Sequence, residues 1–273
     1  MCVTSPPYYG LRDYGGEASQ IGMEQSPEEY IQQLVEVFRL VRDNLTDDGT
    51  LWVNIGDSYY NYRSDGNYPK QTVSKTRQDL PTKTPVRGNK LEGLKSKDLI
   101  GIPWMLAFAL RADGWYLRQD IIWHKPNPMP ESVKDRCTKA HEYIFLLSKN
   151  KNYYYNNEAI KEPAKDWGTR DRSNGKYHNP GSGLVPHSGL TKSYERKNKR
   201  SVWSVTKKPY KGAHFATFPP DLIEPCILAG SEPGDIILDP FMGSGTTAMV
   251  AKQHGRYYIC LLYTSDAADE RQS

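Results

Sequence analysis

The stretch 235–255, DIILDPFMGSGTTAMVAKQHG, contains a complete strand–loop–helix unit. Ile236, Ile237 and Leu238 predict a buried strand, and the residues after Gly245 predict a helix. Gly243 and Gly245 permit a tight turn and the close approach of a ligand to free N–H groups at the start of that helix. No Gly-Lys-Ser/Thr follows, so the loop is not a P-loop. A nucleotide site and a plain glycine-rich helix cap both remain open on this motif alone.

The rest of the chain alternates helix and strand patterns in the same way. Ser26-Pro27-Glu28-Glu29 forms a capping box, and apolar residues at helical spacing follow until Asp48-Gly49. The other expected elements are strands over 50–56, 115–125 and 142–150 and helices over 98–114 and 219–230. This order predicts an α/β fold with a mostly parallel sheet and helices on both faces.

Composition separates an acidic body from two basic segments. The net charge of the 273 residues is only +4, yet residues 161–211 carry a balance of +9 and residues 61–100 one of +5. Such segments suit a polyanionic partner, and solvated loops would have the same composition. No apolar run is long enough to span a membrane, and no leader precedes the first motif, so a cytoplasmic protein is expected.

The residue types that bind metals do not form a metal site in this sequence. Cys2, Cys137, Cys226 and Cys260 make no CxxC pair, so reduced thiols are expected. His141-Glu142 lacks a second histidine at i+4, which argues against zinc and for a packed or hydrogen-bonded histidine. Asp57 follows a strand and is expected in a turn there, and Trp104, Trp115 and Trp123 lie in apolar runs and are expected in the core.

The chain opens with a second unusual loop, Thr4-Ser5-Pro6-Pro7-Tyr8. Two prolines remove two backbone donors and exclude a helix, and the residue before each proline is driven toward extended geometry. The stretch is therefore expected to be a stiff loop that presents the Ser5 hydroxyl, prolyl carbonyls and aromatic rings.

Taken together, TSPPY (4–8), HFATFPPDLIEPCILAG (214–230) and DPFMGSGTT (239–247) resemble the DNA amino-methyltransferases. The resemblance implies an S-adenosylmethionine-dependent methyltransferase-type, Rossmann-like α/β fold with an inserted recognition region. The catalytic motif before the cofactor motif is similar to the permuted group, and Thr before Ser-Pro-Pro-Tyr is similar to the N4-cytosine members. The implied reaction is methyl transfer from S-adenosyl-L-methionine to cytosine N4 in duplex DNA.

The resemblance assigns roles to individual residues. Ser5, Pro6, Pro7 and Tyr8 match the catalytic tetrapeptide: the Ser5 hydroxyl and Pro6 carbonyl would accept hydrogen bonds from the target amine, and Tyr8 would stack on a flipped base, with help from Tyr9. The residues that match the cofactor pocket are Phe218, Pro219, Asp239, Phe241, Gly243, Gly245 and Thr246. The basic residues expected to bind DNA phosphates are Lys192, Arg196, Lys197, Lys199, Arg200, Lys207 and Lys208.

The same resemblance predicts the domain organisation. Residues 1–160 form the catalytic part with a loop insertion at 61–97, residues 161–211 the target-recognition insertion and residues 212–259 the cofactor-binding part of the same domain. Residues 260–273 depart from the family and are similar to a translated sequencing adapter, so we expect a non-native tail and a domain clipped at both ends. A tail without the acidic ribose-binding residue would weaken cofactor binding.

Three alternatives stay open from the sequence. The same geometry suits the N6 amine of adenine, clipping could leave a DNA-binding remnant without catalysis, and related Pro-Pro-Tyr loops act on protein amides or RNA bases. The partners expected are double-stranded DNA and a cognate restriction endonuclease encoded nearby, with no membrane and no metal.

Overall fold

The structure is a computed structural model that describes residues 1–10, 20–60, 91, 93–164, 195–206 and 218–262. In chain order the elements are β1 (Cys2–Thr4), α1 (Pro27–Asn44), β2 (Thr50–Ile55), α2 (Ile102–Ala112), β3 (Tyr116–His124), β4 (His141–Ser148), η1 (Glu158–Ile160), β5 (Glu162–Pro163), β6 (Arg196–Lys197), β7 (Val202–Ser204), α3 (Pro220–Gly230), β8 (Ile236–Met242), α4 (Thr246–Gln253) and β9 (Tyr257–Leu262). The helices of the described ranges are all too short or too polar to cross a membrane.

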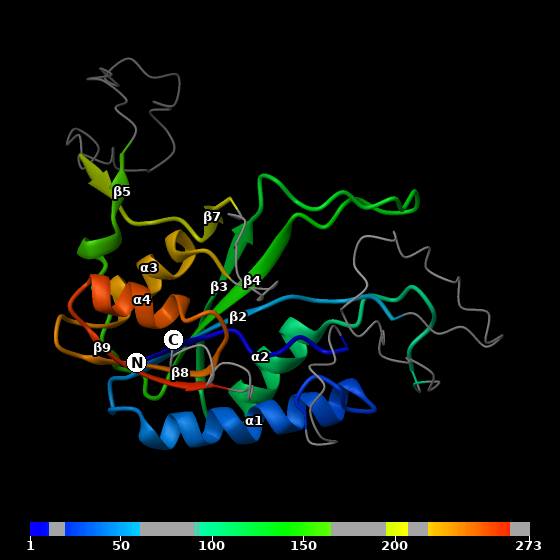
Figure 1. Ribbon diagram of the computed structural model, residues 1–273, viewed down its shortest axis with the longest axis horizontal. Coiled ribbons are helices and arrows are strands. Elements are labelled where there is room, and N and C mark those ends of the chain that lie inside the picture. The colour runs from blue at the N-terminus through cyan, green and yellow to red at the C-terminus, as the bar shows by residue number, and fades with distance from the viewer. Residues whose placement is uncertain (11–19, 61–90, 92, 165–194, 207–217, 263–273) are drawn as a thin grey trace, which may run out of the picture.

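A seven-stranded sheet in the order β7-β3-β4-β2-β1-β8-β9 forms the centre of the molecule (Figure 1). Strand β4 runs antiparallel to both of its neighbours, and the other adjacent pairs are parallel. The predicted mostly parallel α/β sheet is therefore confirmed. Because β4 is reversed, its first residues lie at the same edge as the last residues of the other six strands.

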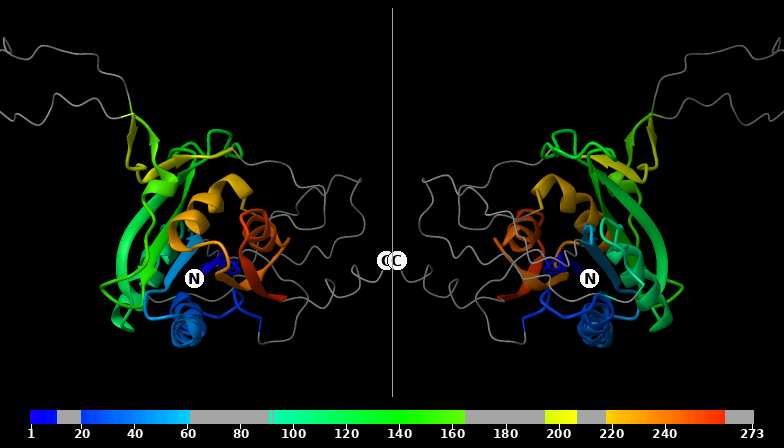
Figure 2. Two further views of the ribbon diagram at one scale, coloured as in Figure 1. Left: turned by 90° about the vertical axis from the view of Figure 1, so that its left-hand side faces the viewer. Right: turned by 90° about the vertical axis from the view of Figure 1, so that its right-hand side faces the viewer.

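Helices cover both faces of this sheet (Figures 1 and 2). Helices α1 and α2 pack on one face, where Leu34 and Phe38 are fully buried with Leu51 of β2. Helices α3 and α4 pack on the other face, where Ile223 and Val250 lie in a second core cluster. Every residue of β2 is buried, as expected of a strand with both faces covered.

Local signals explain where the helices begin. Ser26 caps α1 by accepting a hydrogen bond from the Glu29 N–H at 3.2 Å, as the capping box predicts, and the helix ends at Asn44, before the predicted Asp48-Gly49. Helix α2 begins at Ile102 rather than residue 98, because the Asp57 carboxylate accepts the N–H groups of Gly101 and Ile102. Asp57 therefore closes the turn after β2.

Two of the predicted segments contribute residues to the main sheet. The end of the expected insertion 161–211 belongs to the main sheet, since β7 pairs with β3 and buries Trp203. The expected tail begins inside β9, where Cys260 pairs with Asp239, so residues 260–262 continue a strand of the sheet. Most of the predicted insertion 61–97 and residues 263–273 lie outside the described residues.

Candidate active site

The strands β1 and β8 are neighbours in the sheet although 235 residues separate Thr4 from Asp239. From β1 the chain crosses through α1 to β2, and from β8 it crosses through α4 to β9, in opposite directions and over opposite faces. A crevice at the carboxyl ends of the strands forms at such a point of divergence, and it is the usual ligand site of open α/β sheets. Both sequence motifs begin there.

The loop after β1 is anchored by side chains. Pro6 is buried, and Ser5, Pro7 and Tyr8 are half-buried. The Tyr30 hydroxyl of α1 donates a hydrogen bond of 2.7 Å to the Pro7 carbonyl. Tyr9 is buried against Tyr30 with ring centroids 5.5 Å apart, so it belongs to the core rather than to the exposed part of the site.

Tyr8 is held at both its hydroxyl and its ring. The hydroxyl donates to Glu142 Oε2 at 2.8 Å, and Asn54 Oδ1 lies 3.4 Å away. A Cβ added at Gly56 would come within 2.7 Å of Tyr8 Cε2, so the ring edge packs directly on the backbone after β2. Burial, followed by the nearby Glu142 carboxylate, raises the pKa of Tyr8 well above its usual value, so the hydroxyl stays protonated as a donor.

Asp239 joins the two motif strands. Its carboxylate accepts hydrogen bonds from Thr4 Oγ1 at 2.6 Å, Thr247 Oγ1 at 2.7 Å and the Phe241 N–H at 3.1 Å. The residue is 3% exposed. Burial raises the pKa of Asp239, and the hydrogen bonds from Thr4 and Thr247 oppose that shift. Asp239 thus ties β1 to β8 and α4, and its contact with the cofactor stays a prediction.

The loop after β8 leaves its backbone accessible. A Cβ at Gly243 would meet nothing within 4 Å, and Gly245 has a φ of +78°, a left-handed conformation that glycine adopts freely. Helix α4 has no side-chain cap, so its first N–H groups face the loop without a side-chain acceptor. The Ser244 and Thr246 hydroxyls lie 3.1 Å apart. An anionic group can be held by donors arranged in this way.

The aromatic residues predicted for the cofactor pocket lie on different faces of the sheet. Phe241 packs on the α1 face, edge to face with Phe38 at 6.2 Å. Phe218 packs against the cluster formed by α3 and α4, and Pro219 is the buried N-cap of α3. The structure therefore places them on either side of the β8 loop rather than in contact.

The predicted DNA-binding residues are described only in part. Lys192, Lys207 and Lys208 lie outside the described residues. Arg200 pairs with Glu162 at 2.6 Å and Lys197 with the same carboxylate at 3.4 Å. Arg196 donates to the Lys161 carbonyl at 2.7 Å, and Lys199 lies 5.0 Å from the Trp203 ring centroid.

Three residues that border the loop after β1 could not be singled out from the sequence: Asn54, Gly56 and Glu142. Glu142 was considered only as half of a metal motif with His141, and in the described part of the chain no group of three potential ligands could hold a metal ion. His141 instead packs edge to face on Tyr143, 5.4 Å away. No local pattern reveals Glu142, because the reversed direction of β4 brings it to this edge.

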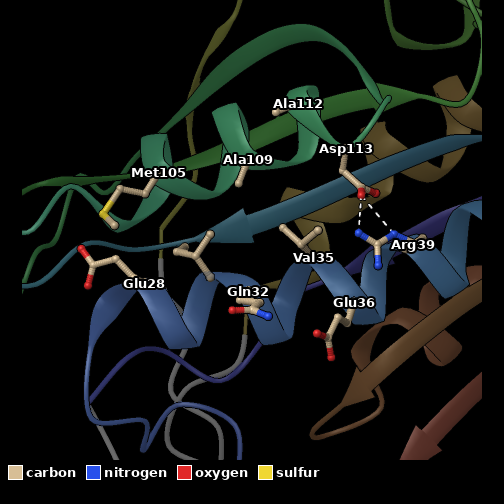
Figure 3. A pocket seen from close by; sticks show the side chains of 10 residues that line it. Glu28, Gln32, Val35, Glu36, Arg39, Met105, Ala109, Ala112 and Asp113 are labelled. Carbon is tan, nitrogen blue, oxygen red and sulfur yellow. Dashed lines mark hydrogen bonds and ion pairs between the residues drawn. The ribbon is translucent and has the colours of Figure 1, made fainter.

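Away from these loops, an open groove lies between α1 and α2 (Figure 3). It is lined by Glu28, Ile31, Gln32, Val35, Glu36, Arg39, Met105, Ala109, Ala112 and Asp113. Arg39 reaches across it to the Asp113 carboxylate. None of the predicted site residues lines it, so the groove is separate from the two loops.

Comparison with known proteins identifies related sequences. A family model described as DNA methylase matches residues 1–270. The chain is 49% identical over 261 residues to the Type II methyltransferase M.Cfr9I of Citrobacter freundii, which covers 94% of this chain and 74% of that protein. It is 50% identical to M.SmaI of Serratia marcescens, with 93% and 76% covered, and 47% identical to M.XycI of Xanthomonas campestris pv. cyanopsidis, with 99% and 80% covered.

Solved structures share the fold at lower identity. The PvuII DNA methyltransferase (cytosine-N4-specific) matches with a TM-score of 0.60 and 18% identity, over 96% of this chain and 74% of that one. A Thermus thermophilus protein complexed with S-adenosyl-L-methionine matches with a TM-score of 0.57 and 22% identity, over 99% and 83%.

Proposed function

The chain belongs to the N6/N4 DNA methylase family, and from that membership we propose that it transfers a methyl group from S-adenosyl-L-methionine to cytosine N4 in duplex DNA. The enzyme class, a Type II DNA methyltransferase, follows from the family and from close relatives over most of the chain. The observation that carries the proposal is the Thr4–Asp239 hydrogen bond, which fixes the catalytic and cofactor loops side by side.

The β8 loop fits the cofactor. The accessible backbone at Gly243 and the uncapped N–H groups of α4 suit the carboxylate of the methionine moiety. When bound, S-adenosyl-L-methionine would supply an electrophilic methyl group, with its methionine part held by the loop after β8. Asp239 fixes the two ends of this loop by accepting hydrogen bonds from the Phe241 N–H and the Thr247 hydroxyl.

The β1 loop fits the amine. An exocyclic amine is a weak nucleophile because its lone pair is delocalised into the ring. Acceptors for its hydrogens, the Ser5 hydroxyl and the Pro6 carbonyl, favour a more tetrahedral nitrogen with an available lone pair. Because the prolines and Tyr30 already fix this loop, the acceptors need little reorganisation during the reaction.

Substrate access and base identity complete the proposal. A base within a duplex must be flipped out before its edge can react, and Tyr8 provides an aromatic platform beside the acceptors. Arg196, Lys197, Lys199 and Arg200 would contact phosphates and give binding that weakens with salt. The choice of cytosine rests on the Thr4-Ser5-Pro6-Pro7-Tyr8 form of the motif.

The test is transfer of radioactive methyl groups from S-adenosyl-L-methionine to duplex DNA, followed by digestion to nucleosides. The proposal expects the label in N4-methyl-2′-deoxycytidine. Label in N6-methyl-2′-deoxyadenosine would move the activity to the other amine. Salt-sensitive DNA binding without any transfer would instead identify a non-catalytic binding protein.

A further inference from the structure

The ion pair between Lys125 and Glu142 borders the loop after β1, because Glu142 also binds the Tyr8 hydroxyl. Lys125 directly follows β3 and Glu142 is the second residue of β4, and the two side chains are 8% and 15% exposed. The Lys125 ammonium also lies 4.4 Å from the Trp123 ring centroid. Both charges therefore sit in a largely dry environment at the edge of the sheet where the site forms.

A pair in this position contributes little to stability by itself. Removing two charges from water costs several kcal/mol per ion, and apolar residues of similar volume often replace such a pair without loss. The contacts of Glu142 indicate a different purpose. Its Oε1 faces Lys125, while its Oε2 accepts the Tyr8 hydroxyl at 2.8 Å. The carboxylate thus links a fixed cation to a residue of the catalytic tetrapeptide.

Tyr8 has little freedom once its hydroxyl is held. Gly56 packs on the Cδ2–Cε2 edge of the ring, and Glu142 holds the hydroxyl group. The polar groups then form a chain from Lys125 through Glu142 to the Tyr8 hydroxyl.

We propose that Glu142 and Lys125 are positioning residues, which fix the Tyr8 hydroxyl and through it the place of the Tyr8 ring beside the Ser5 and Pro6 acceptors. This inference rests on the proposed methyl transfer and adds the groups that hold the aromatic residue of its catalytic tetrapeptide.

The test is a double-mutant cycle with Tyr8→Phe and Glu142→Gln in the full chain. Tyr8→Phe keeps the ring but removes the hydroxyl, and Glu142→Gln keeps the shape but removes the charge. A hydrogen bond to a charged group corresponds to about tenfold in rate, so each variant should lower kcat about tenfold. The double variant should also lose about tenfold rather than about a hundredfold, because Glu142 acts only through the Tyr8 hydroxyl.

The control is Glu158→Gln, which removes the charge from an exposed carboxylate paired with Lys161 and should leave kcat unchanged. Urea unfolding of each variant separates folding from catalysis. Multiplicative kcat losses in the double variant, or loss of stability with unchanged kcat, would overturn the positioning role. A wild-type chain that binds S-adenosyl-L-methionine but methylates no DNA would overturn the proposed function instead, and the inference with it.

Discussion

The loop after β1 and the loop after β8 start on neighbouring strands but differ in composition, because one is rich in proline and the other in glycine. The first contains two prolines and is tethered from outside, by Tyr30 at Pro7 and by Glu142 at Tyr8. The second contains two glycines and has open space at Gly243. One buried carboxylate, Asp239, holds the bases of both.

This difference matches the hydrogen-bonding needs of the two reactants in the proposed methyl transfer. Prolines have no N–H, so the β1 loop presents mainly acceptors, which suit an amine that donates hydrogens. The glycine loop and the start of α4 present N–H donors, which suit the carboxylate of the cofactor. We call the loop after β1 the acceptor loop and the loop after β8 the donor loop. The acceptor loop is held by side chains of other elements, and the donor loop is held by Asp239 of β8. The two loops should therefore fail in different assays.

The largest expected effect is on the donor loop. Gly243→Trp places an indole where a Cβ added to the glycine would meet no atom within 4 Å, so the chain should still fold. The indole should occupy the ligand space and weaken S-adenosyl-L-methionine binding by about 100-fold or more, about 2.7 kcal/mol. Isothermal titration calorimetry measures this directly.

The matched control is Leu40→Trp, which adds an indole at a position of α1 that is 65% exposed. Its cofactor affinity should equal that of the wild type. Unchanged affinity in Gly243→Trp would show that the cofactor does not use the β8 loop, and the comparison between the loops would fail at its first step.

The next effect concerns Asp239, the carboxylate that contacts both loops, and the stability of the fold. Asp239→Ala leaves the Thr4 and Thr247 hydroxyls and the Phe241 N–H without their acceptor in a buried site. We expect the free energy of unfolding to fall by about 3 kcal/mol. Urea denaturation measures the loss. A change below about 0.5 kcal/mol would show that the two strands do not depend on this carboxylate.

The same carboxylate gives a pH dependence. Burial raises the pKa of Asp239 above its ordinary 3.8, so the folded state holds the proton more strongly than the unfolded state. The stabilisation from protonated Asp239 is complete below 3.8 and is lost as the pH rises through the folded pKa. Asp239→Asn has no proton to lose. The stability of the wild type relative to this variant should therefore decrease as the pH rises above about 4, and a constant difference would contradict the shift.

The extent to which these features could be predicted depends on their distance along the chain. Ser26 and the glycine loop were predictable because cap and turn chemistry is local. Glu142 was not, because its position beside Tyr8 depends on the reversed direction of β4. Nor was the burial of Asp239, because its partner Thr4 lies 235 residues away and no periodicity in the sequence records that pairing.

Strand β7 and the end of strand β9 could not be predicted, for a different reason. Strand β7 has three residues, too few for a period, and only its pairing with β3 identifies it. Strand β9 continues through Leu262 because β8 supplies backbone partners as far as Met242. In both cases the neighbouring strand, not the local sequence, sets the boundary.

A smaller effect is expected from a substitution that disturbs the acceptor loop without touching the cofactor site. Gly56→Ala adds a Cβ that would lie 2.7 Å from Tyr8 Cε2, and the anchored hydroxyl prevents the ring from moving freely. Misplacement of a catalytic group by a fraction of an ångström should lower kcat about tenfold without changing cofactor affinity. Steady-state kinetics with duplex DNA measures this. The loss should shrink in a Tyr8→Phe background, where the ring is released; an equal loss there would show that the anchor is irrelevant.

The smallest expected effect comes from the outer tether. Tyr30→Phe deprives the Pro7 carbonyl of its donor and should lower the free energy of unfolding by about 1 kcal/mol. The reaction rate should fall slightly as the acceptor loop loosens, while calorimetry should show unchanged cofactor affinity. Tyr60→Phe is the control: Tyr60 is also buried and accepts the Leu91 N–H, so the stability loss should be similar, with no change in kcat. Weaker cofactor binding in Tyr30→Phe would show that the two loops are coupled through more than Asp239. The hydrogen bond from Tyr30 to Pro7 in the acceptor loop would then also order the N–H donors of the other loop.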